Sequence, residues 1–176
     1  LLKLYGSIPE GQRQTKTGKA ITQKIYGKPV EAGDMMPDWD LYDSQGNLHR
    51  LSDYRGKTLI LDFTSYYCGP CRMAVPFISY FYDKGHGGLE ILSISCDAPS
   101  QFAKMESELK GSYISLNDRD GEDGIFAQCK VIATPSFYVV GPDGIVKTKY
   151  MGLSTEIMNI IARADGFSWG TKVERH

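Results

Sequence analysis

Thr58-Leu59-Ile60-Leu61-Asp62-Phe63-Thr64-Ser65-Tyr66-Tyr67-Cys68-Gly69-Pro70-Cys71 is the stretch that decides the fold of this 176-residue chain. Its first half is apolar at nearly every position, which predicts a strand over 57–63 that is covered on both faces of a sheet. Its second half opens a predicted helix over 70–84, in which Pro76 should produce a kink. A strand, a Cys-x-x-Cys pair and a helix in this order favour redox chemistry at the two sulfur atoms.

The position of each cysteine predicts its part in that chemistry. A helix N-terminus presents unpaired N–H groups and the positive end of the helix dipole, and both stabilise a thiolate. We therefore expect Cys68 to be a partly exposed nucleophile and Cys71, within the first turn, to be a more buried resolving thiol. Gly69 has no side chain to block a substrate, and Pro70 is tolerated in the first turn because its missing N–H has no helical partner.

Two other interpretations of the cysteine pair are weaker. A zinc site needs two further ligands, usually a second close pair, but Cys96 and Cys129 are isolated and the three histidines are scattered. A purely structural disulfide that closes so short a loop would stabilise the fold little. For Cys96 and Cys129 we expect buried, inert thiols, and the alternative is an extra resolving thiol or a regulatory disulfide.

The segments around the cysteine pair alternate between strand and helix patterns. Strands are predicted at 39–43, 48–51, 89–95, 113–116, 136–140 and 146–150, and helices at 100–110, 124–129 and 155–164. The turn Ser44–Asn47 joins the first two strands, and Gly141–Gly144 joins the last two. The order predicts an α/β fold in which a central mixed sheet has helices on both faces and an N-terminal β-hairpin extends the domain.

Residues 1–32 differ in composition from the rest of the chain. Ile8–Gly11 predicts a turn, and apolar residues at helical spacing predict a helix over 16–26. The alternative for this polar, Lys- and Gly-rich segment is a flexible linker. We expect three parts: a helical lead-in or linker at 1–32, a domain at 33–168 and a tail at 169–176.

Composition excludes several classes of function. A net charge of −1 gives no electrostatic reason to bind nucleic acid or an anionic membrane. No run of about twenty apolar residues is present that would span a bilayer, and no signal peptide is visible. The chain begins at Leu1 without a methionine, which suggests processing or trimming. Four cysteines do not suggest a disulfide scaffold.

Three blocks of sequence together resemble the thioredoxin-like proteins, and more closely their extracytoplasmic TlpA-like branch of thiol–disulfide oxidoreductases. The blocks are Leu59–Cys71 with Pro76 five positions on, Ile132–Val140, and the lead-in Gly33–Trp39. The resemblance covers roughly Gly33 to Gly166. One departure is Tyr67, because the family usually has a tryptophan before the first cysteine.

The resemblance implies a thioredoxin fold and a set of roles at the site. Asp62 matches a buried acid whose pKa should be raised, and it would accept the proton of Cys71 directly or through a water; alternatively it faces solvent. Pro135 matches a cis-proline beside the cysteines, and the Thr134 backbone would pair with an extended substrate strand; alternatively the bond is trans. Tyr67, with Tyr66 and Trp39, forms either an aromatic rim or half-buried packing.

The resemblance also implies an activity and its partners. We expect an oxidoreductase that reduces protein disulfides, since Gly69-Pro70 is similar to the dithiol-donating thioredoxins. It would need no cofactor or metal, but it would need an upstream thiol electron donor. The location implied is periplasmic or at the cell surface, with a signal peptide or lipid anchor upstream of Leu1. The cytosol is the alternative, since unpaired Cys96 and Cys129 would suit it.

Two functions of other classes compete with this one. A thiol peroxidase is suggested by the 33–39 lead-in, which also resembles peroxiredoxins. However, the Pro-x-x-x-Thr-x-x-Cys pattern of the peroxidatic cysteine has Leu61 and Ser65 at the matching positions, so the pattern fails. A non-catalytic binding module would use the fold only as a docking surface, and the intact Cys-x-x-Cys argues against it.

Overall fold

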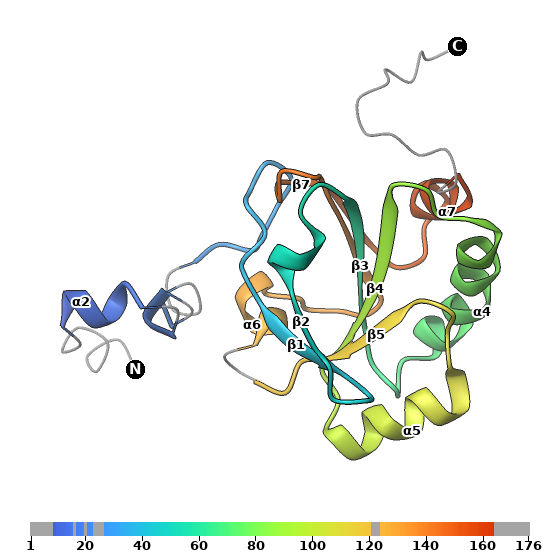
Figure 1. Ribbon diagram of the computed structural model, residues 1–176, viewed down its shortest axis with the longest axis horizontal. Coiled ribbons are helices and arrows are strands. Elements are labelled where there is room, and N and C mark those ends of the chain that lie inside the picture. Colours follow the sequence, from blue (N-terminus) through green and yellow to red (C-terminus); the bar gives the residue numbers. More distant parts are fainter. Residues whose placement is uncertain (1–8, 16, 20, 23–26, 121–123, 164–176) are drawn as a thin grey trace, which may run out of the picture.

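A seven-stranded sheet forms the centre of the protein in a computed structural model that describes residues 9–15, 17–19, 21–22, 27–120 and 124–163. The strand order is β2-β1-β5-β4-β3-β6-β7. Figure 1 shows β3 and β4 near the middle of the domain. The strands are β1 (Asp40–Asp43), β2 (Leu48–Arg50), β3 (Thr58–Thr64), β4 (Leu89–Ser95), β5 (Ile114–Asn117), β6 (Ser136–Val140) and β7 (Val146–Met151). The helices are α2 (Glu10–Arg13), η1 (Leu51–Tyr54), α4 (Gly69–Lys84), α5 (Pro99–Leu109), α6 (Ile125–Cys129) and α7 (Thr155–Ala162).

The continuous apolar runs of the sequence are the central strands. Every residue of β3 and of β4 is buried, and the two strands are parallel in register from Thr58 opposite Leu89 to Thr64 opposite Ser95. On its other side β3 pairs antiparallel with β6. A strand between two neighbours and two covered faces has no solvent-exposed positions, which is why its sequence does not alternate.

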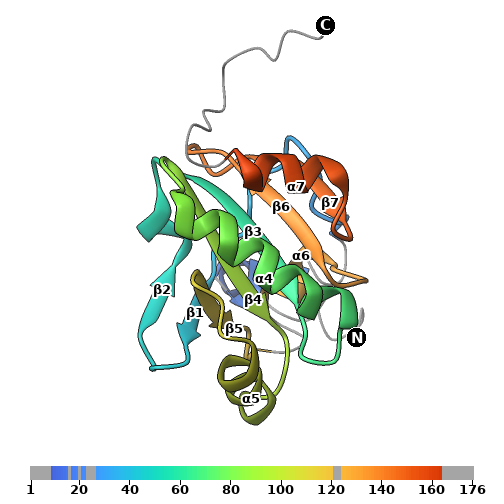
Figure 2. The ribbon, with the colours of Figure 1, turned by 90° about the vertical axis from the view of Figure 1, so that its right-hand side faces the viewer.

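The two faces of the sheet carry separate apolar cores. Because successive strand residues point to opposite faces, Ile60 packs with Ala74 and Ile78 of α4 and with α7, whereas Leu59, Leu61 and Phe63 pack with η1, α6 and Trp39. Figure 2 shows α4 and α7 side by side over one face, with α6 on the other. The predicted α/β class with helices on both faces is therefore confirmed.

The N-terminal hairpin extends the sheet at its edge. β1 pairs antiparallel with β2 and also with β5, where Tyr42 lies opposite Asn117. The sequence predicted the hairpin but not its place beside β5. At the other edge, Val146 of β7 exchanges backbone hydrogen bonds with Gly33 and Asp34 of the lead-in, at 2.8 and 2.9 Å. The lead-in therefore holds the outer strand at this end.

The N-terminal segment differs in part from the expectation. Of the turn predicted at Ile8–Gly11, Ile8 lies outside the described residues, while Glu10 and Gly11 belong to the short helix α2, which has Pro9 at its N-cap. Residues 17–19 and 21–22 are helical, as predicted, while 16, 20 and 23–26 lie outside the described residues, as do 1–8 and the predicted tail. No described helix is long and apolar enough to cross a membrane.

Candidate active site

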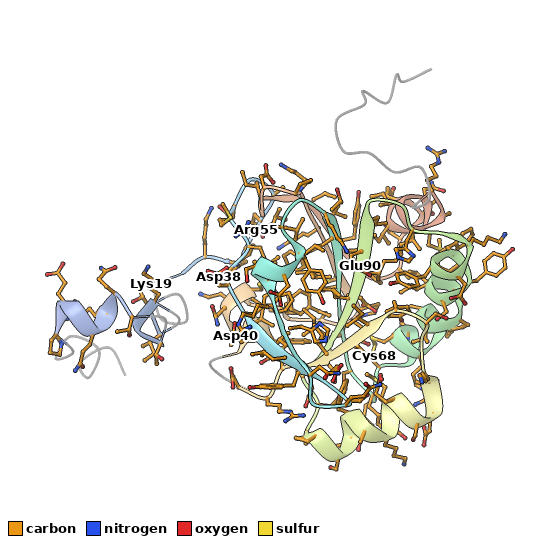
Figure 3. The ribbon with its side chains drawn as sticks, in the orientation of Figure 1. Lys19, Asp38, Asp40, Arg55, Cys68 and Glu90 are labelled. Carbon is orange, nitrogen blue, oxygen red and sulfur yellow. A yellow bond between two sulfur atoms is a disulfide. The ribbon has the colours of Figure 1, made fainter. Side chains whose placement is uncertain are left out.

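Cys68 occupies the N-cap of α4, beyond the carboxyl ends of the parallel strands β3 and β4 (Figure 3). The Cys71 N–H donates to the Cys68 sulfur, at 3.2 Å from nitrogen to sulfur. The sequence forms this cap because Gly69 and Pro70 follow Cys68, and proline is favoured in the first turn of a helix. The Cys68 sulfur thus lies at the positive end of a 16-residue helix, as predicted.

Cys71 lies one turn into α4 and is joined to Cys68 by a disulfide bond. The residue is only 2% exposed, whereas Cys68 is half-buried. Cys68 is therefore more accessible to solvent than Cys71. This difference in burial agrees with the predicted order of attack.

The loop before β6 lies against the same disulfide. The peptide bond between Thr134 and Pro135 is cis, as predicted, so the trans alternative is excluded. The Thr134 carbonyl oxygen is 3.3 Å from the Cys68 sulfur, although the two residues are far apart in sequence. Pro135 is buried and Thr134 is half-buried.

Asp62 lies beneath α4, inside the sheet. It is 2% exposed, and it shares a face of β3 with Ile60, which packs against α4. Its Oδ1 has no hydrogen-bond partner among the described residues. Burial raises the pKa of Asp62 to about 7. The solvent-facing alternative is excluded, and the carboxyl is able to exchange a proton near neutral pH.

The residues around the disulfide form a partly apolar rim. Tyr67 is 74% exposed, with its ring edge-on to Tyr66, and Gly69 and Pro70 are also exposed. Trp39 does not belong to this rim, because it is buried on the opposite face of the sheet and packs against Tyr54. Of the three aromatic residues considered, the structure therefore brings only Tyr66 and Tyr67 to the site.

The two remaining cysteines differ from each other. Cys129 is buried, as expected, and burial raises the pKa of its thiol to about 12. The expectation that Cys96 is buried is wrong, because the residue lies past the last residue of β4 and is exposed. Partial desolvation and the Asp97 carboxylate nevertheless raise the pKa of Cys96.

Sequence reasoning missed two residues near the site. Asp97 accepts hydrogen bonds from the loop that precedes Cys68. Its position directly after a buried strand was the available signal, since such residues gather at one edge of a parallel sheet. Tyr113 is buried in the same apolar cluster that lies under α4, and burial together with the nearby Asp62 raises its pKa.

Comparison with known proteins identifies a family and several relatives. The model of the AhpC/TSA family matches residues 32–149. The thiol-disulfide oxidoreductase ResA of Geobacillus kaustophilus is 31% identical over 129 residues, which is 72% of this chain and 73% of ResA. The thioredoxin-like protein YneN of Bacillus subtilis is 23% identical, and the alignment covers 80% of this chain and 84% of YneN.

Solved structures match the fold. The thioredoxin domain of a thiol-disulfide oxidoreductase from Bacteroides vulgatus superposes with a TM-score of 0.68 at 22% identity, over 77% of this chain and 99% of that domain. A thiol:disulfide interchange protein from a Bacteroides species gives 0.66 at 23% identity, over 84% of this chain and 99% of its own. The predicted thioredoxin fold is confirmed. The chain belongs to the AhpC/TSA family, and within it to the thiol–disulfide oxidoreductases of the thioredoxin fold.

Proposed function

We propose that the protein reduces disulfide bonds of other proteins, with Cys68 as the attacking thiol and Cys71 as the resolving thiol. The observation that carries this proposal is that the two cysteines differ in burial and in position on the helix. Cys68 caps α4 at a half-exposed position, and Cys71 is buried in the first turn. The helix N-terminus stabilises the thiolate form, which is the nucleophile in disulfide exchange.

The reaction begins from the dithiol form and proceeds in two exchanges. The Cys68 thiolate attacks one sulfur of the substrate disulfide, and the other substrate sulfur leaves as a thiolate and takes up a proton. The Cys71 thiolate then attacks the Cys68 sulfur, and the second substrate thiolate leaves. Two electrons have passed to the substrate, and the Cys68–Cys71 disulfide has formed.

Asp62 supplies the base for the second exchange in this proposal. Cys71 is buried, and it lies three positions before Ala74, which packs with Ile60 on the Asp62 side of β3, so bulk water cannot readily take the proton of its thiol. A carboxyl with a pKa of about 7 is half ionised near neutral pH and accepts a proton there without a large energetic cost. The transfer runs directly or through one water.

Residues of the rim position the substrate. The Thr134 backbone beside the Cys68 sulfur pairs with an extended segment of the substrate, which is how sheet edges bind peptides. Tyr67, Gly69 and Pro70 contact the segment on the helix side. Tyr67 is 74% exposed and supplies apolar surface beside Cys68. An apolar surface of this kind suits a protein substrate.

Electron supply and location complete the proposal. The Cys68–Cys71 disulfide that each cycle leaves must be reduced again, so a thiol donor upstream is required. We place the protein outside the cytoplasm, which rests on its TlpA-like sequence blocks and on the persistence of protein disulfides in that compartment. The full-length gene and cell fractionation test this location, and translation starting just before Leu1 without an upstream apolar segment would contradict it.

The assignment of the two sulfurs is tested by trapping the mixed disulfide. The Cys71→Ala variant should stop after the first exchange and retain its substrate through Cys68, and mass spectrometry locates the linkage. The matched control, Cys68→Ala, should retain nothing, and both variants carry Cys96→Ser because the Cys96 thiol is exposed. Substrate held on Cys71 in the control would overturn the assignment.

The class of activity is tested with two substrates. The reduced protein should reduce insulin disulfides and turn over hydrogen peroxide slowly at best. Rapid peroxide turnover without insulin reduction would favour a peroxidase, and turnover of neither would favour a binding module.

A further inference from the structure

The loop that carries Cys68 is held by a single carboxylate from the neighbouring strand. Asp97 accepts from the Ser65 hydroxyl at 2.9 Å through one oxygen, and from the Tyr66 N–H at 2.6 Å and the Ser95 hydroxyl at 2.7 Å through the other. Ser65 and Tyr66 follow β3, whereas Ser95 ends β4. Asp97 therefore ties together the carboxyl ends of two parallel strands at the point where the chain leaves for α4.

Ser65 connects Asp97 to the attacking cysteine by hydrogen bonds. The Cys68 N–H donates to the Ser65 carbonyl oxygen at 3.1 Å, so Ser65 is fixed by its side chain to Asp97 and by its backbone to Cys68. Cys68 in turn caps α4 with its sulfur. Ser65 therefore links the Asp97 carboxylate to the residue that begins α4, and a displacement of Ser65 and Tyr66 would act directly on Cys68.

The backbone of Asp97 is held in place by hydrogen bonds to Asn117 and Ser95. The buried Asn117 donates from Nδ2 to the carbonyl oxygens of Ser95 and Asp97, at 3.1 and 2.9 Å. The Asp97 N–H donates to the Ser95 hydroxyl at 3.1 Å. Because Asn117 belongs to β5, three adjacent strands fix the position of this carboxylate.

We propose that Asp97 is a positioning residue for disulfide exchange, which holds the 65–67 loop so that the Cys68 sulfur stays in line for attack by Cys71. This inference rests on the proposed function and adds a residue to its second step. Attack by one thiolate on a disulfide within the same chain depends strongly on geometry. The closing of the Cys68–Cys71 bond is therefore the step that Asp97 should control.

The test measures this step with a small chromogenic probe, 5,5′-dithiobis(2-nitrobenzoate), in stopped flow at mildly acid pH. Reduced protein should release one chromophore thiolate in a phase that depends on probe concentration, when Cys68 attacks. It should release the second in a concentration-independent phase, when Cys71 displaces the chromophore from Cys68. All variants carry Cys96→Ser, because the exposed Cys96 thiol would also react.

Three variants decide the proposal. Asp97→Ala should slow the second phase roughly tenfold, and Asp97→Asn should recover part of this loss because its amide oxygen still accepts from the Tyr66 N–H. Tyr82→Phe is the matched control, since it removes a hydrogen bond at the opposite end of β4 and should leave the second phase unchanged. The proposal is overturned if Asp97→Ala closes the bond within twofold of the parent, or slows no more than Tyr82→Phe does.

The readout separates this inference from the proposed function. The probe needs no protein substrate. Failure to reduce insulin disulfides would therefore contradict the proposed function, whereas the role of Asp97 would still be tested by the rate at which the Cys68–Cys71 bond closes. Urea unfolding of the same variants measures how much stability each one loses. If Tyr82→Phe loses as much stability as Asp97→Ala but closes the bond at the parent rate, lost stability does not explain the slower second phase of Asp97→Ala.

Discussion

Asp62 is an ionisable side chain placed where its charged form is poorly solvated. Its pKa rises from 3.8 to about 7 because of burial, and its Oδ1 is without a partner among the described residues. A carboxyl that binds its proton more tightly in the folded state than in the unfolded state destabilises the fold once the unfolded chain has ionised. The proposed base is therefore retained at a cost in stability.

We predict that Asp62→Asn slows ring closure at Cys71 and changes how stability depends on pH. In the parent, the contribution of Asp62 to the unfolding free energy should fall between about pH 4 and pH 7, by on the order of 4 kcal/mol, and stay constant above that range. The amide of the Asp62→Asn variant does not ionise, so the variant should lack this fall and be more stable near neutral pH.

Urea unfolding of the oxidised proteins across this pH range measures the effect. Asp38→Asn is the control, because it removes one carboxylate from an exposed position and leaves the core unchanged. Equal ring-closure rates in Asp62→Asn and the parent would remove Asp62 from the mechanism.

The element α4 is anchored at both ends by different chemistry. At its start the Cys68 sulfur accepts from the Cys71 N–H, and near its end the Tyr82 hydroxyl donates to Glu90 of β4 at 2.8 Å. Glu90 is buried, and it also pairs with Lys57 at 3.5 Å. Figure 3 shows Glu90 and Cys68 at separate levels of the sheet. The anchor at Tyr82 lies far from the redox chemistry.

We predict that Tyr82→Phe lowers the unfolding free energy by about 1–3 kcal/mol, because it leaves a buried carboxylate short of one donor. Tyr80→Phe on the same helix is the matched control and should change stability little, since Tyr80 is 56% exposed. Urea unfolding compares the two, and equal stabilities would show that the hydrogen bond contributes nothing.

Individual elements were predictable where their signals are local. The runs 57–63, 89–95 and 136–140 are rich in Leu, Ile, Val and aromatic residues, and the structure has strands there within a residue of the predicted ends. Cys68, Cys71 and Pro135 were likewise found by motif. The place of β1 beside β5 was not predictable, because strand order depends on contacts between distant segments. Asp97 was missed for a similar reason, since its partners come from the ends of two strands.

At the scale of the whole molecule, the described residues form two apolar cores that share one sheet. Alternate residues of β3 belong to different cores, and Phe63 packs edge-on against Phe126 and Tyr138, with ring centres 4.9 and 5.3 Å away. A defect in one core therefore acts on the strand that forms the other. The described domain should unfold as one unit despite its two cores.

We predict that Phe63→Ala costs about 3–5 kcal/mol and keeps a single unfolding transition. In a Trp169→Phe background, Trp39 is the only tryptophan, and its fluorescence reports on the core that contains Phe63. Circular dichroism in the far ultraviolet reports on the helices, including α4 and α7 over the other core. Separate midpoints from the two probes would mean that the cores unfold independently.

The strand order also has a consequence for synthesis of the protein. β1 pairs with β5, and β3 pairs with β6, so both of these early strands have a partner that the ribosome makes much later. While the chain is growing, the buried strand β3 can pair only with β4, and one of its edges stays open until Ser136–Val140 emerges. The sheet can therefore close only after nearly the whole domain has left the exit tunnel, and until then the nascent chain presents an unpaired strand that other chains or a chaperone can bind.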